Sequence, residues 1–256
     1  MNLINTKQLS DGVSLLELNR PEKRNALSIE LLRNLCDAVK KLEADDSQRV
    51  LIIRGIGKVF CAGLDLSEAQ SSDRAHKSAE LVGEMLQTVY ETKMVTIAAV
   101  HGAAIAGGAG LMSACDLVVA ENATKIGYPE VHRGLVAALV LGLLCTQVPR
   151  RKARELLILG EVIEAEEALE CGLITRLCRN GGSLQTAQDL AHKVLLGGPL
   201  AIQQTKQAIN DFTGSSFRSA LASAMDGHLA ARDSDEAKEG FAAFLEKRPP
   251  NWIKKR

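Results

Sequence analysis

The chain has 256 residues, 46% of them hydrophobic, which is enough to bury the core of one large domain or of one domain with an appendage. Its 31 basic residues balance its 31 acidic residues and only 3% of the chain is aromatic, which argues against a nucleic-acid partner or an anionic membrane. We expect a cytoplasmic protein with reduced thiols and neither metal nor membrane contact, because the sequence has no CxxC pair, no signal-peptide pattern and no apolar stretch of membrane-spanning length.

Short apolar runs alternate with helical periodicity along the first 180 or so residues. Strands are predicted at VSLLELN (13–19), RVLIIRG (49–55), VTIAAV (95–100), DLVVA (116–120) and GLITRLC (172–178). Between them, Ser28 is the expected N-cap of a helix with its apolar face at Leu31, Leu35, Val39 and Leu42, and Leu81, Met85 and Val89 repeat that spacing. This order of elements predicts an α/β fold.

Beyond about residue 182, the strand pattern gives way to helices. Four are predicted, at AQDLAHKVLLGGP (187–199), LAIQQTKQAIN (200–210), FRSALASAMDGHLAA (217–231) and DEAKEGFAAFLEK (235–247). Gly197, Gly198 and Pro199 are typical of a boundary. We therefore expect a core of residues 1–195 and a helical segment of residues 196–256.

A glycine-rich stretch, HGAAIAGGAGLMSACD (101–116), follows the third predicted strand. The strand is expected to lead into a helix that begins near Gly107, and the exposed amides at that helix start attract negative charge. A P-loop is excluded because Gly108 stands where its lysine would be, and GAGLMS (108–113) lies too far beyond the strand for a dinucleotide-binding turn. Close helix packing is the structural alternative.

Several motifs occur together in one order: NRPEKRNALS (19–28), GKVFCAGLDLSEA (57–69), the glycine-rich stretch, IGYPEVHRGL (126–135) and EGFAAFLEKRPPNW (239–252). With them the chain resembles the enoyl-CoA hydratase/isomerase family, the crotonases, over nearly its whole length. The resemblance implies a crotonase-like spiral of ββα repeats with a C-terminal helical trimerisation segment, assembled as a homotrimer or a dimer of trimers. It also implies an acyl-CoA thioester substrate that brings its own CoA, and no separate cofactor.

The resemblance assigns roles to particular residues. The family holds the thioester oxygen with two backbone amides, which here belong to Leu64 and Gly107, and such donors stabilise an enolate. Glu130 matches the family's acid/base, whereas Gly110 stands where many of its hydratases carry a second glutamate. The other substrate- or CoA-binding positions implied are Lys23, Arg24, Ala26, Ala62, Asp65, Leu66, Gly108, Gly110, Phe244 and Lys247. Of these, Phe244 and Lys247 match residues that reach the CoA of a neighbouring subunit.

The missing glutamate leaves three functions open. Hydratases of the methylglutaconyl-CoA type are similar to this chain in carrying Gly-Leu at that place (Gly110 and Leu111), which favours hydration of a 2,3 double bond. One carboxyl group is chemically sufficient for moving a double bond from the 3,4 to the 2,3 position, so a Δ3,Δ2-enoyl-CoA isomerase with Glu130 as sole acid/base is the first alternative. The second is a non-catalytic acyl-CoA-binding homologue.

Overall fold

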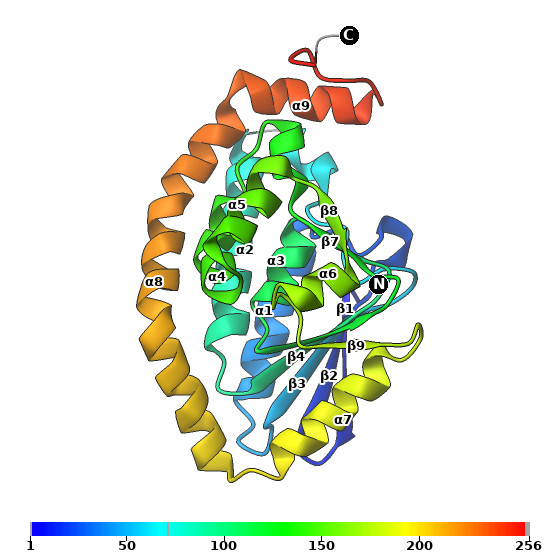
Figure 1. The fold of residues 1–256 in the computed structure, drawn as a ribbon, viewed down its shortest axis with the longest axis vertical. Coiled ribbons are helices and arrows are strands. Elements are labelled where there is room, and N and C mark those ends of the chain that lie inside the picture. Colours follow the sequence, from blue (N-terminus) through cyan, green and yellow to red (C-terminus); the bar gives the residue numbers. More distant parts are fainter. Residues whose placement is uncertain (1, 71, 254–256) are drawn as a thin grey trace.

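Two sheets enclosed by helices make up the computed structural model, which describes residues 2–70 and 72–253 (Figure 1). Within those residues, the larger sheet has the strand order β1-β2-β3-β4-β6-β9, with β1 antiparallel to β2 and the others parallel. Its strands are β1 (Ile4–Ser10), β2 (Val13–Leu18), β3 (Val50–Gly55), β4 (Val95–Val100), β6 (Leu117–Glu121) and β9 (Arg176–Cys178). The smaller sheet has the order β5 (Ala103–Ile105), β7 (Lys125–Gly127) and β8 (Val162–Glu164).

The chain passes repeatedly from the larger sheet to the smaller one and then into a helix. Strand β4 leads through β5 into α3 (Gly107–Ser113), and β6 leads through β7 into the 3-10 helix η3 (Pro129–Arg133). Strand β3 leads to Cys61, which forms a bridge beside β5 with Ala104, and then to η2 (Leu66–Gln70) and α2 (Ser72–Glu91). The predicted α/β spiral of ββα repeats is confirmed.

Helices cover both faces of the larger sheet. On one face lie α1 (Ile29–Glu43) and α2, with the expected apolar residues Leu31, Leu35, Val39, Leu81, Met85 and Val89 buried. The Ser28 hydroxyl accepts a hydrogen bond from the Leu31 amide at 3.2 Å, so the predicted N-cap is present. On the other face, α7 (Ser183–Leu195) packs Ala187, Leu190 and Ala191 against alternate residues of β2 and β3.

Five strand predictions hold in outline, but the last is too long. Strand β9 begins only at Arg176, because the amides of Leu173 and Ile174 donate back to the Ala168 carbonyl and close the preceding helix α6 (Ala165–Glu170). Strand β1 was missed because most of its side chains are polar and exposed. Strands β5, β7 and β8 have three residues each, too few to show a periodicity.

The prediction of separate helices at 200–210 and 217–231 is wrong. Residues 199–233 form one helix, α8 (Pro199–Asp233), which runs along one side of the molecule before α9 (Asp235–Leu245) crosses its end (Figure 1). The turn-forming residues DFTGSS (211–216) continue the helix because packing holds it on both sides of them: Asn210 and Phe217 are buried. The expected boundary at 195/196 falls in the turn between α7 and α8.

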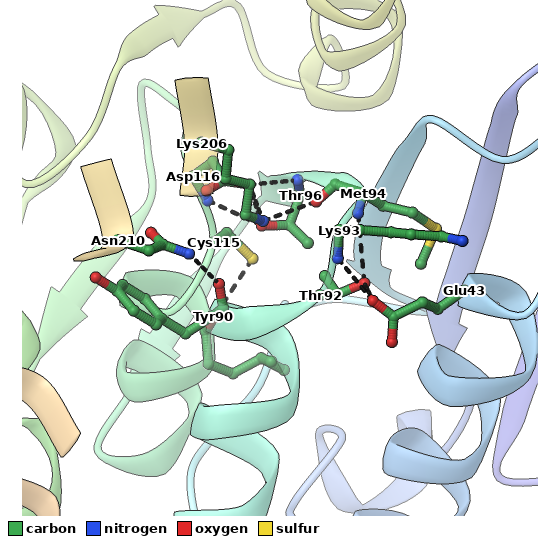
Figure 2. A network of polar contacts seen from close by, with 11 residues as sticks. Glu43, Tyr90, Thr92, Lys93, Met94, Thr96, Cys115, Asp116, Lys206 and Asn210 are labelled. Carbon is green, nitrogen blue, oxygen red and sulfur yellow. Dashed lines mark hydrogen bonds and ion pairs between the residues drawn. The ribbon is translucent and has the colours of Figure 1, made fainter. Parts of the chain in front are cut away.

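A polar network fixes the first third of α8 to the core (Figure 2). Lys206 Nζ donates to the Asp116 carboxylate and to the Met94 carbonyl, each at 2.7 Å. The same Asp116 oxygen accepts from the Thr96 amide at 2.7 Å and from its hydroxyl at 2.9 Å, and Asn210 donates to a carbonyl of α2. The rest of α8 is thereby directed across α2 and the 3-10 helix η4 (Ala138–Val140).

Three further short elements complete the description: the 3-10 helix η1 (Pro21–Lys23) and the helices α4 (Leu141–Gln147) and α5 (Arg150–Leu159). Among the residues described, no helix combines the length and the apolar character needed to cross a membrane. The same residues include no group of three or more His, Cys, Asp or Glu side chains placed to hold a metal ion.

Candidate active site

Two turns rich in glycine pack directly against each other, one after β3 and one after β5. Gly63 has φ +94°, and a Cβ atom there would lie 2.9 Å from the Ile105 carbonyl oxygen. A Cβ atom on Gly108 would lie 2.4 Å from the carbonyl oxygen of Cys61. Because no side chain fits at either place, glycine lets the two backbones touch and brings Leu64 beside Gly107.

The amides of Leu64 and Gly107 point away from the backbone hydrogen bonds around them. Leu27 donates to the Gly63 carbonyl at 2.8 Å and accepts from the Asp65 amide at 3.1 Å, so the N–H of the intervening Leu64 faces the opposite side. Gly107 is the first residue of α3, where a helix leaves its N–H groups without an intrahelical acceptor. Both residues line one cavity of about 370 Å³, so both amides can donate to an oxygen bound there.

Most of the residues singled out from the sequence line this cavity. They are Lys23, Arg24, Ala26, Ala62, Leu64, Asp65, Leu66, Gly107, Glu130 and Phe244. Phe244 therefore faces the cavity of its own chain, whereas the resemblance implied contact with the CoA of a neighbouring subunit. Lys23 and Arg24 are exposed, which places their charges in solvent at the edge of the cavity.

Three positions implied by the resemblance do not line the cavity. Gly108 faces the backbone of Cys61, as described above. Gly110 packs under η4, where a Cβ atom would lie 3.0 Å from Val140 Cγ1, so a side chain at this position would have to displace Val140. Lys247 is exposed just past the end of α9 and could meet a CoA only from outside this chain's cavity.

Glu130 brings a carboxyl group into the cavity from η3. Burial, the largest cause, raises the pKa of Glu130 to about 7, and the nearby Arg133 guanidinium offsets part of that shift. Its Oε2 atom is buried and has no hydrogen-bond partner in the described part of the chain. Tyr128, just before η3, is fully buried and shares a 2.7 Å hydrogen bond with the Ser113 hydroxyl, which ties this turn to α3. The carboxyl group can therefore both take up and release a proton near neutral pH.

Two polar residues that sequence reasoning missed hold the loop of residues 19–28 in place. Arg20 Nη1 donates to the Asp65 carboxylate at 2.6 Å and to the Ala26 carbonyl at 3.1 Å. The Asn25 side chain is fully buried and donates to the carbonyls of Val59 and Phe60. The contacts with Asp65, Val59 and Phe60 each span more than thirty positions, so nothing in the local sequence distinguishes these residues from ordinary surface polar residues.

Three further cavity residues were also missed: Arg133, His228 and Arg232. Arg133 lies over the ring of Phe244, with its guanidinium carbon 4.5 Å from the ring centroid. His228 and Arg232 belong to α8 and are one helical turn apart. The residues next to them in the sequence are mainly small or polar, so the local pattern offers no reason to expect His228 and Arg232 inside a cavity.

The raised pKa of Glu130 predicts a pH-dependent stability. In the unfolded chain this carboxyl has its ordinary pKa of 4.5, and in the folded protein the pKa is about 7. Between these values the folded state binds the extra proton, so the free energy of unfolding falls as the pH rises from about 4.5 to about 7. Glu130→Gln carries no charge, and we expect it to be more stable than the parent at pH 8 by up to about 3 kcal/mol, with the gain vanishing toward pH 4.5.

Thermal unfolding at pH 5 and pH 8 measures this difference. Glu161→Gln makes the same change at an exposed position and should shift the unfolding temperature little, and equally at both pH values. A Glu130→Gln protein that is less stable than the parent at pH 8 would mean that the folded protein stabilises the charged carboxylate.

The sequence of the chain is similar to those of known proteins. The family model for enoyl-CoA hydratase/isomerase matches residues 8–255. The 2,3-dehydroadipyl-CoA hydratase of Escherichia coli is 32% identical over 241 residues, covering 94% of this chain and 94% of its own length. A relative from Thermus thermophilus, named as an enoyl-CoA hydratase by similarity, is 38% identical over 246 residues, covering 94% of this chain and 97% of its own length.

Solved structures show the same fold. The crystal structure of an enoyl-CoA hydratase from Mycobacterium avium has a TM-score of 0.89 at 30% identity, covering 99% of this chain and 100% of that one. The two sheets and C-terminal helices are thus those of the crotonase fold. By its sequence over residues 8–255, its fold and its named relatives, the chain belongs to the enoyl-CoA hydratase/isomerase family of acyl-CoA enzymes.

Proposed function

We propose that this enzyme hydrates the 2,3 double bond of an enoyl-CoA thioester, with Glu130 as its acid/base and the amides of Leu64 and Gly107 as the oxyanion site. The observation that carries the proposal is that Glu130, with a buried carboxyl oxygen that has no partner, lines the same cavity as Leu64 and Gly107. The amides of these two residues point away from the backbone hydrogen bonds around them. The exposed Lys23 and Arg24 at the edge of that cavity suit the phosphates of CoA.

The chemistry divides into two proton movements. Glu130 as carboxylate takes a proton from water while the water oxygen bonds to C3, and the electron pair of the double bond moves toward the thioester carbonyl. Negative charge then gathers on the carbonyl oxygen, where the two amides stabilise it. Glu130 returns the proton to C2, so the product contains the elements of one water and the carboxyl group regains its starting charge.

Isomerisation is the second candidate, and one observation favours it. Glu130 is the only carboxyl group in the described lining that is neither exposed nor ion-paired, because Glu22 is exposed and Asp65 pairs with Arg20. A single base suffices to remove a proton from C2 and return it to C4. Glu130 would serve as that base, with the same two amides at the enolate oxygen.

Mass spectrometry of the products detects hydration, and the absorbance of the conjugated enoyl thioester detects isomerisation, so the two measurements together separate the possibilities. With crotonyl-CoA, hydration adds the mass of one water, and with a 3-enoyl-CoA isomerisation leaves the mass unchanged while the double bond moves into conjugation. We expect hydration to be the faster reaction. Faster isomerisation would support the second candidate, and binding of both thioesters without turnover would identify a non-catalytic acyl-CoA-binding protein.

We also propose that the protein acts in the cytoplasm as a homotrimer or a dimer of trimers. Large apolar side chains along α8 and the turn before it stay exposed in the single chain: Leu196, Leu200, Ile209 and Phe212, the last of them 88% exposed. Such side chains are typical of a surface covered by another subunit. Sedimentation equilibrium should give a mass three or six times the 27.5 kDa of one chain, and a monomer would contradict the proposal.

A further inference from the structure

A buried positive charge on α8 faces the cavity without a full set of partners. Arg232 is only 6% exposed and lines the cavity, yet its Nε and Nη1 atoms have no hydrogen-bond partner in the described part of the chain. One turn earlier, His228 is equally buried and its Nε2 atom is likewise without a partner. Neither residue has a place in the proton transfers proposed for Glu130.

Leaving a guanidinium in this state costs stability. Burial lowers the pKa of Arg232, and the charge of the neighbouring Asp233 offsets only part of that effect. Buried charges are normally paired and fully hydrogen-bonded, because removing them from water costs several kcal/mol. A ligand that supplied a negative charge and hydrogen-bond acceptors would relieve this cost.

The charge balance around the buried part of the cavity is positive. Asp65 is paired with Arg20 at 2.6 Å, and Glu22 is exposed. Glu130 has a pKa of about 7, so at neutral pH it carries only part of a negative charge. Two positive charges, the guanidiniums of Arg232 and Arg133, outweigh this partial negative charge. The Nε atom of Arg133 is also buried without a partner in the described part of the chain.

Arg232 and His228 differ in their burial from Lys23 and Arg24, the cations suited to CoA. Lys23 and Arg24 are exposed, as befits contacts with phosphates that remain hydrated at the protein surface. Arg232 and His228 are enclosed, and they share their cavity with apolar residues of η4, Leu139 and Val140. This enclosed and largely apolar part of the cavity suits an acyl chain better than the charged nucleotide of CoA.

We infer that the acyl group of the substrate carries a carboxylate, which Arg232 binds in the enclosed part of the cavity, so that the preferred substrates are thioesters of dicarboxylic acids with one acid group free. The inference rests on the proposed binding of acyl-CoA at this site. His228 also lines the cavity; its Nδ1 lies 2.8 Å from the Val136 carbonyl and donates to it, which leaves Nε2 as the ring nitrogen without a partner. Burial, the largest cause, lowers the pKa of His228, so the ring becomes a second donor only where the charge of the bound carboxylate offsets that shift and Nε2 is protonated.

Binding of saturated thioesters tests the inference without depending on turnover. Succinyl-, glutaryl- and adipyl-CoA carry a free carboxylate, and butyryl-, pentanoyl- and hexanoyl-CoA are their uncharged partners of equal chain length. Calorimetric titration of the parent protein should show at least one diacid thioester binding about 10- to 100-fold more tightly than its partner, the range expected for hydrogen bonds to a charged group. If none of the three binds more tightly than its partner, the inference is wrong.

Variants on α8 assign the preference to a residue. Arg232→Met keeps the length of the side chain but removes the charge, and we expect the ratio of the two affinities to fall to about one. Arg232→Lys should keep part of the preference. Arg218→Met makes the same change about four turns earlier on α8, where the exposed guanidinium pairs with Glu91 of α2 instead of lining the cavity, and should keep all of the preference.

The ratio of affinities separates a substrate contact from other roles. If Arg232→Met weakens both series equally, the side chain contacts CoA or supports the fold, and the inference is wrong. Equal and measurable binding of both series by the parent overturns this inference alone, whereas no binding of any thioester overturns the proposed function as well. Because the parent protein decides these last outcomes, the test does not depend on any variant folding.

Discussion

Glu130→Gln is expected to lower kcat by about 10²- to 10⁴-fold and to leave the affinity for a saturated thioester nearly unchanged. Glutamine keeps the shape and the hydrogen-bonding capacity of the side chain but cannot take up a proton from water or deliver one to C2. Burial of the neutral amide costs less than burial of the carboxylate, so the cavity should keep its form. Steady-state turnover of a 2-enoyl-CoA and calorimetric binding of its saturated analogue measure the two quantities.

The pH profile provides an independent check on the same residue. Since the reaction begins with Glu130 as carboxylate, kcat/KM of the parent should fall about tenfold per pH unit below the pKa of Glu130, which is about 7. The residual kcat/KM of Glu130→Gln should not show this fall at low pH, whereas the kcat/KM of Glu161→Gln should show it as the parent does. Full hydration and isomerisation activity in Glu130→Gln would exclude Glu130 as the acid/base.

Gly107→Pro is expected to lower kcat/KM by about 10²- to 10³-fold relative to Gly107→Ala, because proline removes one of the two donors to the enolate oxygen. Alanine is the matched control: it adds a Cβ atom, which would lie 3.1 Å from Leu27 Cδ1, but keeps the N–H. The first position of a helix tolerates proline, so the substitution acts on the amide more than on α3. Steady-state kinetics on one enoyl-CoA compare the two variants.

The residue before the new proline requires a folding control. Ala106 has φ 50° and ψ −121°, whereas a residue before proline favours extended backbone at negative φ. Circular dichroism and thermal unfolding should therefore accompany the kinetics, and only folded Gly107→Pro protein counts. A folded variant as active as Gly107→Ala would remove the Gly107 amide from the oxyanion site.

The sequence located the residues of the site that belong to local motifs. Leu64, Gly107 and Glu130 lie in the segments that follow β3, β5 and β7, and the fold brings those segments to one cavity. The family resemblance added the reason to look at backbone amides, which no side-chain pattern can reveal. Gly110 shows the limit of this reasoning, because the sequence could not tell that η4 fills the space beside it.

Residues far apart in the sequence account for most of what was missed. Whether His228 and Arg232 face solvent or a cavity depends on the direction of α8, and that direction is set by Lys206 and Asn210 through contacts with distant elements. The turn residues at 211–216 predicted a break where tertiary packing keeps the helix continuous. Helical periodicity predicts which residues share one face of a helix, but it does not predict which part of the protein that face packs against.

The anchoring of α8 also bears on the order in which the protein matures during synthesis. Lys206 and Asp116, whose contact fixes the helix, lie 90 positions apart, and α8 supplies His228 and Arg232 from near the end of the chain. Domains begin to fold from the N-terminus while translation continues, so both amide turns and Glu130 leave the ribosome before α8 does. Until then the cavity lacks the part of its wall that α8 supplies, so a nascent chain at that stage exposes apolar surface that the finished protein covers.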